Sequence, residues 1–229
     1  NVPAVSHALA RGELRLGTVD TYLLYRLTGG AAYRTDYSNA SRTELFDISR
    51  LAWSEELCDA FGVPASVLAE VCDSDADFGM TDFEGYLDEP IPIHGILGDS
   101  HGALFAQGCV RAGMVKATYG TGSSVMMNVG ESPVRSGSGL VSSLAWKLNG
   151  TVSYVLEGNV NYAGAVITWL KDDLGLIRSA DETEALARAA AEGDRSYLVP
   201  AFTGLGAPYW DSDATGALVG MTRTTHRAE

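Results

Sequence analysis

Two glycines and three hydroxyl residues occupy a short turn between two apolar runs. The segment is VKATYGTGSSVMMNVG, residues 115–130, and its turn consists of Gly120, Thr121, Gly122, Ser123 and Ser124. Glycines allow a backbone to approach a ligand closely, and turn N–H groups with hydroxyls form a concave site for an anion. A glycine-rich hairpin without a ligand explains the same residues, so the turn alone leaves both interpretations open.

The carboxylate of Asp99 is a second candidate for chemistry. The apolar run IPIHGIL, residues 91–97, predicts a buried strand, and residues 103–109 predict a helix. An acid where a buried strand gives way to a helix is a favoured position for chemistry in α/β proteins. Aspartate is also a frequent helix N-cap, and the spacing does not separate the two roles.

The charge balance argues against a nucleic-acid surface. The chain of 229 residues carries 29 acidic and 16 basic residues, a net charge of −13. Binding to nucleic acid needs clustered lysines and arginines that neutralise phosphates. A nucleotide site remains compatible with this charge, because backbone amides and a metal ion can replace side-chain cations.

Metal, disulfide and membrane signals are absent from the sequence. The three cysteines are odd in number and show no CxxC spacing, which predicts reduced thiols. His7, His94 and His226 have no partner spacing for a metal, so we predict no metal site built from side chains. No apolar run reaches the length of a membrane span and no signal peptide is found. We expect a soluble protein of the cytoplasm.

The elements that must position these residues are a mixture of helices and strands. Helical spacing that includes Val19, Tyr22 and Leu23 predicts a helix over residues 17–27, and Ser54 and Gly62 are expected to cap another. A second hairpin is expected around Asn149-Gly150. Further helices are predicted over residues 161–177 and 181–193, a last strand over residues 216–222 and an acidic surface connection over residues 73–90. Hairpins beside helices favour a layered α/β fold.

Five stretches, in order over nearly the whole chain, resemble the FGGY family of carbohydrate kinases, and within it the glycerol kinase branch. They are GTVDTYLLYRLTGG, TDYSNASRTELFDI, GDSHGALFAQGCVRAGMVKATYGTG, LEGNVNYAGAVITWL and VPAFTGLGAPYWDSDATGALVGMTRTTHRAE. The resemblance implies α/β ribonuclease H-like domains of the actin and hexokinase type, which close over ATP with Mg²⁺ and over a polyol or sugar. It places the latter part of the N-terminal domain in residues 1–92 and the first part of the C-terminal domain in residues 93–229.

The resemblance also implies that these residues are one part of a longer enzyme. Family members are about twice as long, with a glycine-rich phosphate loop in the region before Asn1 and an adenosine loop in the region after Glu229. We therefore expect the stretch to be inactive alone.

Several residues match family positions that handle the nucleotide and the proton. Gly120, Thr121 and Gly122 fall in the family's second phosphate loop, and Gly164 falls where a helix approaches the nucleotide, although close helix packing is a rival explanation for a glycine. Asp99 matches the family's catalytic base, which orients the acceptor hydroxyl and takes its proton.

The acceptor pocket is implied by Tyr37, Asp99, Ser100, His101 and Ser124. Tyr37 matches a pocket tyrosine, while the neighbouring Asp36 is equally explained as a turn residue and is not included. Glycerol kinases have Gln-Gln where this chain has Ser100 and His101, and a phenylalanine where it has Ser124. These changes favour a roomier, more polar pocket for a larger polyol or pentulose. His101 either contacts the acceptor or lies at the start of a helix.

The expected partner is therefore a small-molecule polyol or sugar, without nucleic acid or membrane, and homo-oligomerisation stays open. The alternative is a non-catalytic, actin-like nucleotide-binding regulator. Asp99 disfavours it, because a nucleotide sensor has no use for a base that faces an alcohol.

Overall fold

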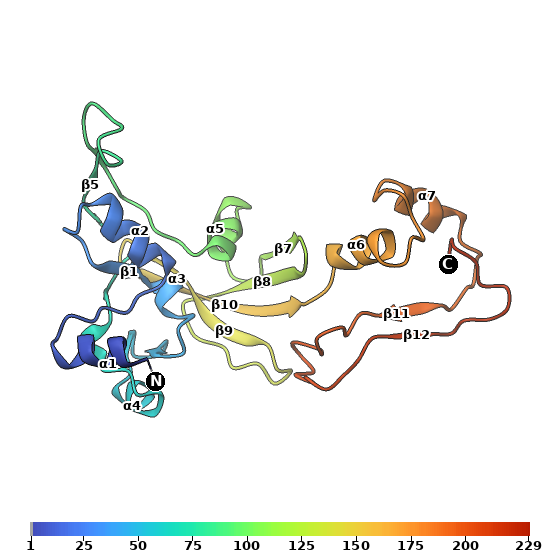
Figure 1. The fold of residues 1–229 in the computed structure, drawn as a ribbon, viewed down its shortest axis with the longest axis horizontal. Coiled ribbons are helices and arrows are strands. Elements are labelled where there is room, and N and C mark those ends of the chain that lie inside the picture. The colour runs from blue at the N-terminus through green and yellow to red at the C-terminus, as the bar shows by residue number, and fades with distance from the viewer. Residues whose placement is uncertain (1) are drawn as a thin grey trace. The chain divides into compact units, whose positions relative to one another are not determined.

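The computed structural model of the protein describes residues 2–229 and divides them into two compact units (Figure 1). The first unit runs to Val115 and adds Met127–Arg135 and Ser142–Leu156. The second unit consists of Lys116–Met126, Ser136–Val141 and Glu157–Glu229. Strand residues of one sheet therefore belong to both units, and the chain contains both helices and strands, as the predicted α/β class requires.

The helices are short and are separated by strands or turns. They are α1 (Pro3–Ala10), α2 (Val19–Leu27), α3 (Tyr37–Ala40), α4 (Glu55–Phe61), the 3-10 helix η1 (Ala65–Val67), α5 (Asp99–Ala106), α6 (Gly164–Asp172) and α7 (Glu182–Ala189). The two-stranded sheets pair β1 (Arg34–Asp36) with β4 (Glu70–Cys72), β2 (Phe46–Asp47) with β3 (Ala52–Trp53), β5 (Met80–Thr81) with β6 (Ile91–Pro92), and β11 (Tyr197–Val199) with β12 (Ala217–Val219).

The largest sheet has four strands in the order β7-β8-β10-β9, with ranges Val115–Tyr119, Ser123–Gly130, Thr151–Val160 and Val141–Leu148. Both predicted hairpins are confirmed, because β7 neighbours β8 and β9 neighbours β10. Asn149 and Gly150 have φ angles of 49° and 79°. Two positive φ values at the turn are what a tight Asn-Gly hairpin requires.

Helix α4 ends as its sequence predicts. The Ser54 hydroxyl accepts a hydrogen bond of 3.2 Å from the Leu57 amide, and Gly62 closes the helix in the left-handed conformation with φ of 67°. A side-chain oxygen satisfies one of the free amides of the first turn, and glycine adopts positive φ without steric cost.

Helix α2 lies close to its predicted range but buries a different face. Thr21 and Leu24 are buried, whereas Val19, Tyr22 and Leu23 are exposed. Leu24 joins Ala32 and Phe78 in one core cluster of the first unit. The hydroxyl of Thr21 lies 3.4 Å from that of Thr18, so its polar atom is partnered within the chain.

Two predictions for residues 73–97 are wrong. The stretch 73–90 is not purely a surface connection, because Phe78 is fully buried and Ser74 and Thr81 are also buried. The expected buried strand over residues 91–97 is only two residues long, and Ile91 is 46% exposed. Ile93 and Ile96 instead pack against the cluster around Phe78, so the apolar run contributes side chains to the core without forming a longer strand.

The C-terminal part of the second unit is an antiparallel pair, β11 and β12, with a long loop between them (Figure 1). Tyr197 pairs with Val219 and Val199 with Ala217. Trp210 anchors the loop, since its indole N–H donates a hydrogen bond of 2.6 Å to the carbonyl of Gly139. The ring itself is 60% exposed, so the anchor is this hydrogen bond and not burial.

Candidate active site

The turn between β7 and β8 is attached to the first residues of α6 in the second unit. The amide of Gly164 donates to the carbonyl of Gly120 at 2.8 Å, and the amides of Ala163 and Ala165 donate to the carbonyl of Thr121 at 2.9 Å and 3.1 Å. Amides at the start of a helix lack partners within the helix, and here the turn supplies them. The position of the turn is therefore tied to α6.

The glycines of this region have different structural reasons. A Cβ atom at Gly122 would lie 2.6 Å from the carbonyl oxygen of Val160, and one at Gly164 would lie 2.6 Å from that of Gly120. Both positions require glycine for packing alone. A Cβ atom at Gly120 would meet only the oxygen of Gly122, at 3.7 Å, which is an ordinary contact. The packing of the chain therefore does not explain glycine at residue 120.

A cavity of about 790 Å³ opens beside this turn, which is within the usual size of small-molecule pockets. Its lining consists of Gly120, Thr121, Tyr162, Gly164, Ala165, Thr168, Trp169, Asp173 and Phe202. Three of the four predicted nucleotide residues are among them. Thr121 and Thr168 supply hydroxyls to the lining, and both residues are exposed.

Three aromatic rings line this cavity, and sequence reasoning did not identify them as site residues. The Phe202 ring lies 5.0 Å from that of Tyr162 and 4.9 Å from that of Trp169, between ring centres. Trp169 follows the spacing of a half-buried helix and so reads as an ordinary packing residue. Phe202 is 33 or more positions distant from the other two in the sequence, so only the fold joins them.

Ser124 is held by hydrogen bonds to two charged side chains, those of Lys116 and Glu157. Its hydroxyl donates to Oε1 of Glu157 at 2.9 Å, and Nζ of Lys116 lies 3.2 Å from the same hydroxyl oxygen. Lys116 is 1% and Glu157 4% exposed, so a buried cation and a buried anion share one bridging hydroxyl. Buried charges need such partners. The contact of Ser124 with an acceptor stays a prediction.

Asp99 is the first residue of α5 in the first unit, and it is exposed. Gly98 holds the N-cap position, without a side-chain cap. The Asp99 carboxylate accepts one short local bond of 2.6 Å, from the amide of Ser100. Since a capping aspartate bonds the second or third amide of the helix, Asp99 is not the cap that its sequence position allowed.

His101 lies in the first turn of α5 and is only 3% exposed. A Cβ atom at Gly98 would be 2.8 Å from Nδ1 of His101 and 3.6 Å from Oγ of Ser38. The chain before Asp99 therefore runs in close contact with both side chains. The burial favours a positional role for His101, and its contact with an acceptor stays a prediction, as does that of Ser100.

Tyr37 begins α3 and is half-buried between an aromatic ring and a cation. Its ring packs edge-on against Phe46 at 5.8 Å, and Nζ of Lys147 lies 4.8 Å from the ring centre. Lys147 also donates to Asp73 at 2.9 Å, which raises the pKa of the Lys147 ammonium. The predicted acceptor residues Tyr37, Asp99, Ser100 and His101 all belong to the first unit, whereas Ser124 and the β7–β8 turn belong to the second.

Asp36, which the sequence did not separate from a turn residue, is fully buried next to Tyr37. Its carboxylate accepts hydrogen bonds from the amides of Ser38 and Asn39 and therefore caps α3. It also accepts from the side chains of Ser38, Asn39 and Ser74. The burial of Asp36 and its bond to the distant Ser74 are tertiary features, and no local pattern in TDYSN predicts them.

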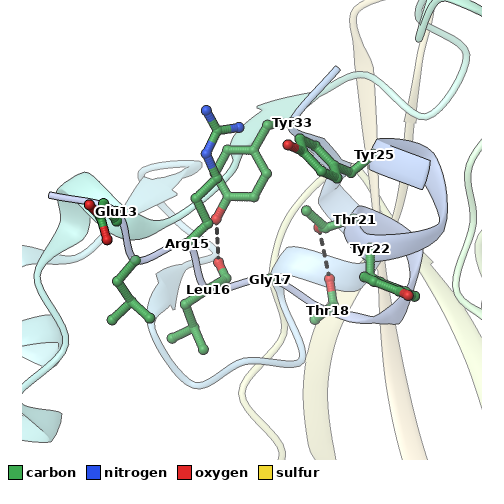
Figure 2. A pocket seen from close by; sticks show the side chains of 10 residues that line it. Glu13, Arg15, Leu16, Gly17, Thr18, Thr21, Tyr22, Tyr25 and Tyr33 are labelled. Carbon is green, nitrogen blue, oxygen red and sulfur yellow. Dashed lines mark hydrogen bonds between the residues drawn. The ribbon is translucent and has the colours of Figure 1, made fainter. Parts of the chain in front are cut away.

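A second cavity, of about 550 Å³, lies around the loop that precedes α2 in the first unit (Figure 2). The guanidinium of Arg15 stacks over the rings of Tyr33 and Tyr25, at 4.7 Å and 5.6 Å. The Tyr33 hydroxyl is shared between the carbonyls of Leu16 and Val67. These polar groups make contacts that hold the loop in place. The lining of this cavity contains none of the residues predicted to bind the nucleotide or the acceptor.

Within residues 2–229, no group of three or more His, Cys, Asp and Glu side chains is arranged to hold a metal ion. Over the same residues, every helix is too short or too polar to span a bilayer.

Two sequence profiles match the chain in succession. Residues 1–106 match the profile described as the FGGY family of carbohydrate kinases, N-terminal domain, and residues 115–229 match the C-terminal domain of the same family. The boundary predicted between residues 92 and 93 stays a prediction.

The curated relatives include a glycerol kinase from Alteromonas mediterranea, 49% identical over 229 residues, with 100% of this chain and 46% of the relative covered. Glycerol kinase 1 from Pseudomonas aeruginosa is 51% identical over 225 residues, with 98% of this chain and 45% of the relative covered. The chain thus spans less than half the length of the curated relatives that it matches.

Solved structures share the fold. A Plasmodium falciparum glycerol kinase with ADP has a TM-score of 0.88 at 36% identity, with 100% of this chain and 46% of that chain covered. A ligand-bound xylulose kinase from Lactobacillus acidophilus has a TM-score of 0.77 at 23% identity, with 91% and 42% covered. The second likeness concerns the fold alone. The predicted actin and hexokinase type of α/β fold, incomplete in this chain, is confirmed.

Proposed function

Because this chain belongs to the FGGY family of carbohydrate kinases, we propose that the intact protein transfers the γ-phosphoryl group of ATP to a hydroxyl of a polyol or sugar. Relatives at about half identity are glycerol kinases, and one structural neighbour was solved with ADP. The chain covers under half of these proteins, so the proposal concerns the whole enzyme. This stretch alone is expected to be inactive.

The cavity beside the β7–β8 turn supports the nucleotide part of the proposal. The open position at Gly120 is the observation that carries it, since glycine there serves no packing contact and leaves room for a phosphate against the backbone. The Thr121 hydroxyl is a donor for a phosphate oxygen. Gly122 keeps the turn against the end of β10, and Gly164 keeps it against α6. The rings of Tyr162, Trp169 and Phe202 offer an apolar wall to a flat base.

Asp99 supports the acceptor part. As the acceptor oxygen forms its bond to the γ-phosphorus, the bond from that phosphorus to the ADP oxygen breaks, and the hydroxyl proton moves to the Asp99 carboxylate. An exposed carboxylate that caps no helix is free to accept it. The Tyr37 ring faces carbon-bound hydrogens of the acceptor, and its hydroxyl offers a hydrogen bond.

Magnesium enters this proposal as part of the nucleotide substrate. Within residues 2–229 no acidic or histidine cluster is arranged as a resident metal site. Magnesium in phosphoryl-transfer sites is held by one or two carboxylates together with substrate phosphates and water. Its charge neutralises the phosphate oxygens.

The proposed location is the cytoplasm, where ATP is available. The three cysteines are free thiols, which suits a reducing compartment. Localisation of a fluorescent fusion of the intact protein tests this location.

The acceptor is tested with the intact protein and a panel of polyols and sugars, with ADP release as the signal. Ser124 and Ser100 are smaller than the residues of glycerol kinases at these positions, and the hydroxyl of Ser124 is already bonded to Glu157. Ser124 therefore offers space more than a hydrogen bond. We expect four- and five-carbon acceptors to give a higher kcat/KM than glycerol, because a longer carbon chain fills that space.

Two outcomes of the panel count against the proposal. Glycerol as the best acceptor by about tenfold would reject the preference for longer acceptors, since contacts of methylene size provide discrimination of that order. No ADP release with any acceptor, in a protein that still binds MgATP, would reject the kinase and favour the non-catalytic nucleotide-binding regulator.

A further inference from the structure

Asp36 gathers five hydrogen bonds in a site closed to solvent. Oδ1 accepts from the Ser38 hydroxyl at 2.9 Å, the Asn39 amide at 3.0 Å and the Asn39 side chain at 2.8 Å. Oδ2 accepts from the Ser38 amide at 3.0 Å and the Ser74 hydroxyl at 2.7 Å. Every partner donates, and an ionised carboxylate is the form that only accepts. The environment is therefore built for the anion.

Two of these donors, the hydroxyls of Ser38 and Ser74, also accept a hydrogen bond from a backbone amide that is distant in the sequence. The oxygen of Ser38, whose proton points to Asp36, accepts the amide of Gly98 at 2.8 Å. The oxygen of Ser74 accepts the amide of Lys147 at 3.2 Å in the same way. Because each hydroxyl has one proton, a carboxylate that takes it leaves the oxygen lone pairs for the amides. Asp36 thus sets the direction of both bonds.

The two amides that these serines bind, those of Gly98 and Lys147, belong to residues next to the proposed acceptor residues. Gly98 directly precedes Asp99, and its backbone is close to Ser38 and His101. Lys147 lies over the ring of Tyr37. Tyr37 itself stands between Asp36 and Ser38 in the sequence. All of these residues belong to the first unit, so the network lies within one compact body.

We propose that Asp36 is a positioning residue, which fixes the chain entering Asp99 through Ser38 and the Lys147–Tyr37 contact through Ser74. This inference rests on the proposed function, because it concerns the base and the acceptor residue of that reaction. It adds a group that does not itself touch the substrate.

Amide hydrogen exchange, resolved by residue and measured on the intact protein, tests the network without turnover. Ser38→Ala and Ser74→Ala are a matched pair, since each removes one hydroxyl between Asp36 and one amide. Ser38→Ala is expected to raise the exchange rate of the Gly98 amide roughly fivefold, the value of one net hydrogen bond, without changing that of Lys147. Ser74→Ala is expected to do the reverse, and Asp36→Asn to raise both rates.

Kinetics then distinguishes positioning from general stability. With an acceptor from the panel, Ser38→Ala is expected to lower kcat about tenfold or more, because a small displacement of a base is costly, while KM for MgATP stays unchanged. Ser74→Ala is expected to act mainly on KM for the acceptor through Tyr37. Thermal unfolding of each variant gives its stability, and Asp36→Asn need not fold for the serine pair to decide.

The proposal is overturned if Ser38→Ala leaves the Gly98 exchange rate unchanged, or if Ser74→Ala raises it equally. It is also overturned if Ser38→Ala exchanges as expected but retains the wild-type kcat. A wild-type protein that releases no ADP with any acceptor rejects the proposed function, and Asp36 as a positioning residue for that reaction with it. The exchange rates alone would then still show whether the network exists, so the two failures are distinguishable.

Discussion

The carbonyl oxygen of Gly120 accepts the amide of Gly164 at 2.8 Å and lies 2.6 Å from where a Cβ atom of residue 164 would stand. One oxygen therefore both ties the β7–β8 turn to α6 and excludes a side chain from the helix start. Any larger residue at 164 must push the turn away or lose the bond. Gly164 was expected near a nucleotide, and the fold gives it a packing reason in addition.

Gly164→Ala is expected to lower the stability of the protein, whereas Gly120→Ala is expected to lower its affinity for MgATP. Alanine at 164 forces atoms together, which costs about 1–3 kcal/mol, so the melting temperature falls. Alanine at 120 meets only an ordinary contact at 3.7 Å, so stability stays near that of the wild type while MgATP affinity falls. Differential scanning calorimetry and nucleotide titration measure the two effects. An unchanged melting temperature for Gly164→Ala would contradict the packing argument.

Asp99→Asn in the intact protein is expected to lower kcat by at least about a hundredfold, the low end for loss of a general base. Asparagine keeps the volume of the side chain, and Asp99 caps no helix, so thermal stability is expected to stay the same. Asp88→Asn, at an exposed loop position, is the matched control for the loss of one negative charge. Near-normal turnover of Asp99→Asn would remove Asp99 from the mechanism.

Thr121→Val is expected to weaken MgATP binding or turnover and to leave acceptor binding intact. Valine keeps the branched shape and removes the hydroxyl of a residue that lines the cavity, while the carbonyl of residue 121 still accepts the amides of Ala163 and Ala165. Isothermal titration with each ligand measures the difference, and Thr151→Val at an exposed strand start is the control. Equal nucleotide affinity with normal kinetics would leave the turn as a structural hairpin.

The Lys147–Asp73 pair predicts a pH dependence of stability. The hydrogen bond to Asp73 raises the pKa of Lys147 above its ordinary value of 10.5. The folded state then holds the proton more tightly than the unfolded state, so the stabilisation is complete below 10.5 and is lost as pH rises through the folded pKa. The difference in melting temperature between wild type and Lys147→Met should be constant from neutral pH upward and shrink only above 10.5.

Lys171→Met, which removes a more exposed lysine, is the control for that experiment. Both variants lose one positive charge, so general charge effects cancel in the comparison. A difference for Lys147→Met that already shrinks near neutral pH would show that the pair with Asp73 does not hold the proton.

Local signals in the sequence were sufficient for the turns and caps of this protein. Asn149-Gly150 makes a hairpin because both residues tolerate positive φ. Ser54 caps the start of α4 and Gly62 its end, each by hydrogen bonds to atoms within a few residues. The glycine-rich turn after β7 and the acid that starts α5 were located in the same way. Such features depend on residues a few positions apart in the chain, so the sequence alone is enough to predict them.

Burial and long-range partners were decided by the tertiary structure. Leu24 of α2 is buried because Phe78, from a distant segment, packs in the same cluster. Ile93 and Ile96 pack against that cluster without forming a long strand. Asp36 resembles an ordinary turn aspartate until Ser74, 38 positions away, reaches its carboxylate. A side chain's own sequence neighbours do not determine which distant groups desolvate it, so the role of Asp36 emerges only once the chain has folded.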